Sequence, residues 1–159
     1  MWRAARRLPL RLEIPGRPAV SLRHLLLDLN GTIARDGRLL PGVRRRLPRL
    51  ARILEVRVLT ADTFGTAAAQ LRGLPVSLVR VETGADKARL ARALEGVAAV
   101  GNGANDAGML RAAALGVAVV GPEGMAGELV AAADVVVVRV EDALDLVLRP
   151  GRLAATLRR

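Results

Sequence analysis

Several residue types are absent from this chain of 159 residues, or nearly so, and each absence excludes a kind of site. There is no cysteine, which excludes disulfides, thiol catalysis and thiolate zinc sites. His24 is the one histidine, so a metal cluster built from imidazoles is excluded as well. The aromatic residues are Trp2 and Phe64, too few for the base-stacking platforms of proteins that bind single-stranded nucleic acid.

Lysine and asparagine are almost as scarce. The 25 basic residues are 24 arginines and Lys87, and against 15 acidic residues they give a formal net charge of +10. The asparagines are Asn30, Asn102 and Asn105. A charge of this size would ordinarily indicate an anionic partner such as nucleic acid or a membrane surface. Because no long basic block stands out, we interpret most arginines as solvated surface and expect no nucleic-acid partner.

Long hydrophobic runs are also missing. None reaches the roughly 18 residues of a membrane span, and the best, Ala131–Val138, contains Asp134. The segment Met1–Leu10 lacks the apolar stretch of a signal peptide. We therefore expect a cytoplasmic protein with no membrane partner. The hydrophobic content of 52% is ample for one core, and the length suits one domain over residues 1–159.

Short apolar runs alternate with amphipathic segments along most of the chain. Pro48 lies inside the amphipathic segment Pro41–Leu54 and predicts a kink or a break there. This alternation predicts a Rossmann-like, doubly wound α/β fold with a mostly parallel sheet and helices on both faces. The expected strands are Ala19–Leu29, Val56–Thr60, Pro75–Val81, Val97–Val100, Val117–Val120 and Val135–Val138. The expected helices are Pro41–Leu54, Thr63–Leu71, Ala85–Leu94, Asn105–Ala114, Gly124–Ala132 and one or two after Glu141.

Two hairpins are expected beside this sheet. Residues 1–23 form an N-terminal extension, in which the alternating segment Arg11–Ile14 is followed by a turn at Pro15–Pro18. The second hairpin spans Ile33–Leu40, where Asp36-Gly37 supplies the positive φ angles of a tight primed turn.

In a doubly wound sheet, ligands bind at the carboxyl ends of the strands, so the polar residues after each strand are the candidates for a site. The first segment is Asp28–Thr32. A carboxylate at the tip of a buried strand can act as a nucleophile or bind a hard cation. Gly31 and Thr32 let backbone N–H groups approach an anion closely. The alternative is an Asx-type turn without further function.

Three later strand ends also carry polar groups. Thr60 can donate to a phosphoryl oxygen or simply precede a helix cap. Lys87 offers a compact point charge that arginine does not reproduce, or it is an ordinary surface lysine. In Gly101–Leu110 the glycines let the backbone bend beneath a ligand and Asp106 can bind a metal, or Asn105 or Asp106 only caps a helix. All three asparagines and the one lysine fall within these four segments, which turn propensity does not explain.

Together these segments resemble the motifs of the haloacid dehalogenase (HAD) superfamily of phosphoryl-transfer proteins. Asp28–Thr32, DLNGT, matches the D-x-D-G-T opening motif, while Thr60 and Lys87 stand where the second and third motifs place them. Gly101–Leu110, GNGANDAGML, matches the G-D-G-x-N-D-x-x-M-L form of the fourth motif, which P-type cation ATPases share. The resemblance covers the chain from about Leu25 onward and is greatest to small, soluble, P-type-ATPase-like members.

The resemblance implies a phosphoryl-transfer site with Mg²⁺ as cofactor. Asp28 would attack phosphorus to form an aspartyl-phosphate, and the catalytic set would be Asp28, Asn30, Thr60 and Lys87. The implied phosphate-binding residues are Asp28, Gly31, Thr60, Ala61, Lys87 and Asn105. The implied metal-binding residues are Asp28, Asn30 through its backbone carbonyl, Asn102, and Asp106 directly or through water.

Two residues depart from the family pattern. Asn30 replaces the aspartate that serves phosphatases as general acid and base, a function typically worth about 10²–10⁴-fold in rate. Asn102 replaces a metal-binding aspartate, and Mg²⁺ binds charged oxygen ligands better. We therefore expect a slow phosphatase-like hydrolase. The alternative is a catalytically idle module that binds a phosphorylated ligand or a protein partner.

The spacing of the motifs leaves no room for a cap domain. Asp28 and Thr60 are 32 positions apart, and Thr60 and Lys87 are 27 apart. The site is therefore expected to be open, with the hairpin Ile33–Leu40 as a flap. Its phosphorylated substrate, of unknown identity, would be large or would be enclosed by a second subunit in a homo-oligomer.

Overall fold

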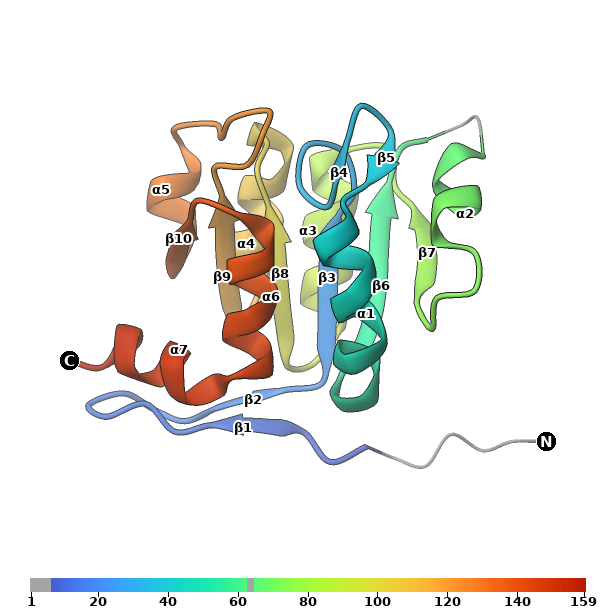
Figure 1. Cartoon of the computed structure of the whole chain (residues 1–159). Helices are drawn as coiled ribbons and strands as arrows, with labels where there is room; N and C mark the ends of the chain where they lie inside the picture. The colour runs from blue at the N-terminus through green and yellow to red at the C-terminus, as the bar shows by residue number, and fades with distance from the viewer. Residues whose placement is uncertain (1–6, 63–64) are drawn as a thin grey trace.

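The computed structural model describes residues 7–62 and 65–159. A six-stranded parallel sheet lies at its centre, with the strand order β10-β9-β8-β3-β6-β7 and helices on both faces (Figure 1). This confirms the predicted doubly wound fold. The strands are β3 (His24–Asp28), β6 (Glu55–Thr60), β7 (Ser77–Arg80), β8 (Val97–Gly101), β9 (Leu115–Val119) and β10 (Val135–Val137).

The strand order reverses beside β3. From β3 the chain moves outward through β6 and β7, then returns to place β8 on the other side of β3 and continues to β9 and β10. Connections on the two sides leave in opposite directions, so a crevice forms at the carboxyl ends of β3 and β8. Asp28 is the last residue of β3, which places it at this crevice.

Helices cover the two faces of the sheet. One face carries α1 (Pro41–Ile53), α2 (Thr66–Leu71), α6 (Val140–Leu148) and α7 (Pro150–Leu157). The other carries α3 (Gly84–Ala93), the short 3-10 helix η1 (Ala104–Asp106), α4 (Ala107–Ala112) and α5 (Leu129–Ala132).

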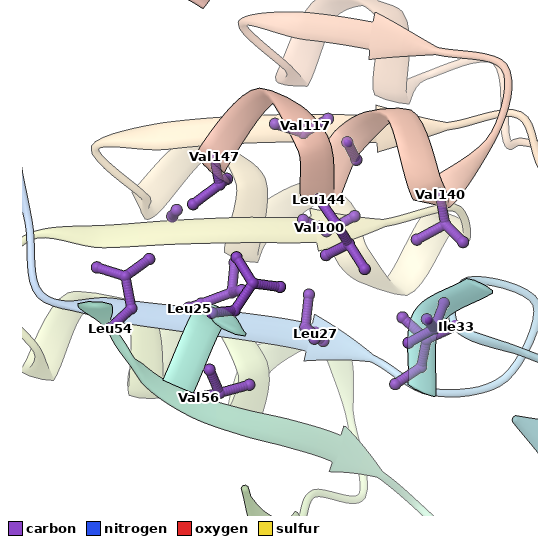
Figure 2. Packing of buried hydrophobic residues seen from close by; sticks show 14 of the residues in the cluster. Leu25, Leu27, Ile33, Leu54, Val56, Val100, Val117, Val140, Leu144 and Val147 are labelled. Carbon is purple, nitrogen blue, oxygen red and sulfur yellow. The ribbon is translucent and has the colours of Figure 1, made fainter. Parts of the chain in front are cut away.

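Residues of β3 alternate between the two cores. Leu25 and Leu27 belong to the cluster that includes Val100 and Leu144 (Figure 2), and Leu26 belongs to the cluster on the opposite face. Successive side chains of a strand point to opposite faces, so a strand covered on both sides is a continuous apolar run.

The two expected hairpins are present. In the first, β1 (Leu10–Leu12) pairs antiparallel with β2 (Val20–Leu22), and the pair lies next to α7 beyond the amino ends of the central strands (Figure 1). Residues 1–6 of the expected extension lie outside the described residues. In the second, β4 (Ala34–Arg35) pairs with β5 (Arg38–Leu39). Asp36 and Gly37 have φ angles of 49° and 75°, as a primed turn requires.

Four local expectations need correction. The strand expected over Ala19–Leu29 is divided: β2 pairs with β1 in a separate sheet, and the central strand β3 begins only at His24. Between them, the backbone N–H of Arg23 donates to the Gly96 carbonyl, so the chain changes partners there. Helix α1 runs through Pro48 without a break; Pro48 is exposed, so the carbonyl that loses its N–H partner can be hydrated. The helix expected over Thr63–Leu71 begins at Thr66, and residues 63–64 lie outside the described part. Of the helix expected over Gly124–Ala132, only α5 forms, because Gly124 has a φ of 82° and Asn102 holds this loop by hydrogen bonds.

The connections around the crevice are short. Within the described residues, the β4–β5 hairpin and α1 occupy the chain between Asp28 and β6, and α2 and β7 occupy the chain between Thr60 and α3. Neither connection holds a cap domain, as predicted. Across residues 7–62 and 65–159, every helix is too short or too polar to span a membrane.

Candidate active site

The carboxyl ends of β3, β6 and β8 surround a pocket of about 320 Å³. Eight predicted site residues line it, namely Asp28, Asn30, Gly31, Thr60, Ala61, Lys87, Asn102 and Asn105. Val81, Glu82, Thr83, Gly103 and Glu123 complete the lining. The structure therefore brings together every predicted site residue except Asp106, whose side chain lies behind the pocket.

Lys87 lies between two carboxylates. Its Nζ donates to Asp28 Oδ1 at 2.6 Å and to Asp106 Oδ1 at 2.7 Å, and all three side chains are buried. Buried charges are tolerated when they are paired and hydrogen-bonded in this way. An ammonium group has three N–H donors, so one remains for an oxygen atom in the pocket.

The position of Lys87 follows from the way α3 begins. Thr83 caps the helix: its side chain accepts from the backbone N–H of Asp86 at 3.2 Å, and the Asp86 carboxylate accepts from the backbone N–H of Thr83 at 3.0 Å. This capping box determines where the first turn starts. Lys87 is in that first turn, on the side that faces β3 and η1.

Asp106 acts as a support for the site. Its Oδ2 accepts from the backbone N–H groups of Asn102 and Gly103, both at 3.0 Å, while its Oδ1 accepts from Lys87. A Cβ on Gly101 would lie only 2.5 Å from the Asp106 carboxyl carbon, so glycine is needed there. The Asp106 side chain is fully buried and does not line the pocket, so it does not face the pocket as a direct metal ligand would.

Thr32 is a site residue whose side-chain role the sequence interpretation missed. Its hydroxyl is fully buried and lies 2.9 Å from Asp28 Oδ2 and 3.0 Å from Asn102 Oδ1. A hydroxyl has one proton, so it donates to one of these oxygens at a time. Thr32 thereby links Asp28 to the loop after β8. Its place as the last residue of DLNGT was the available signal.

Thr60 ends β6 with its hydroxyl at the pocket. Its Oγ1 accepts from the backbone N–H of Asp62 at 3.0 Å, and the Asp62 carboxylate accepts from the backbone N–H of Ala67 at 2.8 Å. The hydroxyl proton is therefore available for an acceptor in the pocket. Thr60 thus has both properties that the sequence allowed, because it shapes the turn and faces the site.

Burial and charge shift the ionisation of Asp28 and Lys87. Burial and the nearby Asp106 carboxylate raise the pKa of Asp28 to about 6, although Lys87 and Thr32 act in the opposite direction. Burial alone would lower the pKa of Lys87, but the carboxylates of Asp28 and Asp106 outweigh it and raise that pKa. The ammonium group of Lys87 therefore stays charged beside Asp28 and Asp106.

The oxygen donors at the pocket suit Mg²⁺. The pocket presents the Asp28 carboxylate, the side-chain amide of Asn102 and the loop that contains the Asn30 carbonyl. Mg²⁺ typically binds one or two carboxylates and completes its shell with water and substrate phosphate. Within the described residues there is no group of three His, Cys, Asp or Glu side chains arranged to hold a metal by themselves. The donor set therefore fits an ion that is shared with a phosphate.

A second pocket of about 310 Å³ adjoins the first. Asn30 and Ala61 line both pockets, and Gly37, at the tip of the β4–β5 hairpin, lines the second. Asn30 is exposed between them. The hairpin predicted as a flap therefore borders space next to the candidate phosphate site.

Comparison with curated proteins finds uncharacterized relatives. No family model matches the chain. MJ0073 of Methanocaldococcus jannaschii is 45% identical over 62 residues, which are 39% of this chain and 67% of that protein. MJ0072 of the same organism is 54% identical over 39 residues, which are 24% of this chain and 89% of that protein.

Comparison with solved structures finds proteins of the HAD superfamily. A HAD subfamily III A hydrolase from Legionella pneumophila superposes with a TM-score of 0.68 at 17% identity, over 86% of this chain and 87% of the other. The 3-deoxy-D-manno-octulosonate 8-phosphate phosphatase of Moraxella catarrhalis, solved with magnesium, phosphate and KDO, superposes with a TM-score of 0.65 at 14% identity. The match covers 86% of this chain and 94% of the phosphatase. A zinc-transporting PIB-type ATPase in the E2.Pi state superposes with a TM-score of 0.59 at 27% identity, over 74% of this chain and 20% of the ATPase.

Proposed function

The chain belongs to one family with the uncharacterized MJ0073 and has the fold of the HAD superfamily, and from this premise we propose that it is a Mg²⁺-dependent phosphohydrolase acting through an aspartyl-phosphate on Asp28. The observation that carries the proposal is the contact between Asp28 and Lys87, at the tip of β3 and in the wall of an open pocket. Phosphoryl transfer to an aspartate requires a nucleophile and a cation that binds the phosphate. Asp28 and Lys87 would supply them, and buried hydrogen bonds hold both side chains.

In the first step, an Asp28 carboxylate oxygen attacks the phosphorus of a phosphate monoester. The new O–P bond forms as the bond from phosphorus to the leaving oxygen breaks, and that oxygen takes a proton from water. The free N–H of Lys87 and the hydroxyl of Thr60 would donate to the transferring phosphoryl oxygens. Bound Mg²⁺ would reduce the repulsion between the carboxylate and the phosphate. Magnesium and phosphate in the Moraxella phosphatase of the same fold support this cofactor.

In the second step, a water molecule attacks phosphorus and the bond to Asp28 breaks. Inorganic phosphate leaves, and the Asp28 carboxylate is regenerated for another turnover. The attacking water must lose a proton, and the amide of Asn30 cannot accept it. Loss of general base catalysis typically costs about 10²–10⁴-fold in rate, so the acyl-phosphate is expected to persist.

Phosphate labelling tests this proposal directly. The full chain is incubated with radiolabelled acetyl phosphate at saturating Mg²⁺, with Asp28→Asn as the matched variant. We expect an acid-stable, hydroxylamine-labile label in the wild-type protein, and no label in Asp28→Asn or after chelation of the metal. Absence of label in the wild-type protein would overturn the proposal.

A second candidate function is a module that binds a phosphorylated ligand without turning it over. Asn30 and Asn102 favour it, because each replaces a carboxylate of the family pattern. The two candidates differ in their response to Mg²⁺ and beryllofluoride, which together mimic a phosphorylated aspartate. Tight binding of both supports the enzyme. Failure to bind them, together with absence of label, supports the module.

A further inference from the structure

The loop after β9 brings another carboxylate to the pocket. Glu123 lies in this loop, between β9 and α5, and lines the same pocket as Asp28 and Asn102. Its side chain is exposed and makes no hydrogen bond or ion pair with any other residue that the structure describes. Both oxygens of the Glu123 carboxylate are therefore available to a ligand in the pocket.

Glu123 and Asn102 meet above the backbone of Gly31. A Cβ added to Gly31 would lie 3.0 Å from Glu123 Oε2 and 2.7 Å from Asn102 Nδ2. Gly31 also has a φ of 77°, in the left-handed region that favours glycine. The loop that follows Asp28 thus leaves room for both side chains next to Gly31, in the pocket that Asp28 also lines.

Asn102 holds the loop that carries Glu123. Its Nδ2 donates to the Gly124 carbonyl at 3.0 Å, and its backbone carbonyl accepts from the N–H of Ala126 at 2.9 Å. An aspartate at position 102 has no N–H to donate to Gly124, and it would repel the Glu123 carboxylate. The amide at 102 and the carboxylate at 123 are therefore compatible with each other, whereas two carboxylates in these places would compete.

We propose that Glu123 supplies the carboxylate that Asn102 does not, and that it contacts the divalent cation directly or through water. This inference rests on the proposed Mg²⁺-dependent function. It assigns the metal site to Asp28, the Asn30 carbonyl, Asn102 and Glu123, with Asp106 behind them as a positioning residue for Lys87. The site would then have two carboxylates facing the ion, a number that Mg²⁺ sites commonly use.

Calorimetric titration of the full chain with Mg²⁺ tests the assignment without any measurement of activity. Glu123→Gln should weaken Mg²⁺ binding by about 10- to 100-fold, the range typical when a group around a bound metal is removed. The matched control is Glu128→Gln, an exposed glutamate that does not line the pocket, and it should bind Mg²⁺ as the wild-type protein does. Equal affinities for Glu123→Gln and the wild type would overturn the inference.

A charge exchange sharpens the test. In Asn102→Asp with Glu123→Gln, the carboxylate moves to position 102, and we expect Mg²⁺ affinity to recover at least half of the loss, on a logarithmic scale, seen in Glu123→Gln. No recovery would show that Glu123 does not replace a ligand at 102, which also overturns the inference. Failure of the proposed function has a different signature, since the wild-type protein would then bind no Mg²⁺ and take no phosphate label.

Discussion

The two ends of strand β3 each hold three ionisable side chains, in very different surroundings. At the carboxyl end, the side chains of Asp28, Lys87 and Asp106 are 10%, 5% and 0% exposed. At the amino end, His24 and Arg57 are partly buried at 15% and 18%, and their partner Glu55 is 52% exposed. One strand of five residues thus has a buried cluster of ionisable groups at its carboxyl end and a partly exposed one at its amino end.

The difference shows which charged groups the chain keeps although their burial lowers the stability of the fold. Removing charges from water costs several kcal/mol per ion, and apolar residues often replace a buried ion pair without loss of stability. Exposed ion pairs contribute roughly 0–1 kcal/mol and can be gained or lost with little effect. The buried trio is therefore better explained by chemistry at the pocket than by folding, and the amino-terminal trio needs no such role.

The largest effect is expected from adding a base at the carboxyl end. In Asn30→Asp the new carboxylate can accept the proton of the attacking water, so hydrolysis of the acyl-phosphate should accelerate by about 10²–10⁴-fold. The rate at which the phosphate label decays under single-turnover conditions measures this hydrolysis. Asn30→Thr is the matched control and should remain slow, because a neutral hydroxyl is not a base. An unchanged rate in Asn30→Asp would show that proton transfer does not limit the reaction.

The next effect concerns stability and compares the two ends directly. Lys87→Met leaves Asp28 and Asp106 buried without their cation and should lower the free energy of unfolding by about 3–5 kcal/mol. Arg57→Met at the amino end should lower it by less than about 1 kcal/mol. Urea denaturation of both variants gives the comparison. Adding Asp106→Asn to Lys87→Met should restore part of the loss, and equal losses at the two ends would refute the contrast.

The smallest effect is a pH dependence of stability that comes from the amino end of β3. Arg57 Nη1 donates to His24 Nδ1 at 2.9 Å. Burial, together with the charge of Arg57, lowers the pKa of His24 below its usual 6.5. The unfolded chain therefore binds this proton more readily than the folded chain does. The contribution of His24 to stability is complete above about pH 6.5 and is lost as the pH falls through the lower pKa of the folded protein.

Unfolding free energies of the wild type and His24→Gln, measured between pH 7.5 and 5, test this sign. Their difference removes the contribution of other groups that titrate nearby, such as Asp28, whose pKa of about 6 acts in the opposite direction. The wild type should lose stability relative to His24→Gln as the pH decreases. A constant difference would contradict the lowered pKa of His24 in the folded protein.

Much of the fold was predictable because it depends on local patterns. The apolar run Leu25–Leu27 predicts a strand buried on both faces, and Asp36-Gly37 predicts a primed turn, as observed. The possible break at Pro48 is not observed, and the helix expected over Gly124–Ala132 is shorter than predicted, both for reasons outside local propensity. Pro48 faces solvent, and Asn102, more than twenty positions earlier, holds Gly124 and Ala126 in a loop.

The polar segments that follow the central strands could be recognised from the sequence, because strand periodicity and motif spacing are properties of the chain alone. The carboxyl ends of parallel strands lie at one edge of the sheet, so Asp28, Thr60 and Asn102 could be grouped without coordinates, and Lys87 joined them through the motif order. The direction of each side chain depends on contacts between loops and could not be predicted from the sequence. Asp106 lies behind the pocket, Thr32 contacts Asp28, and Glu123 lies beside Asn102. These positions follow from packing between loops that are distant in sequence.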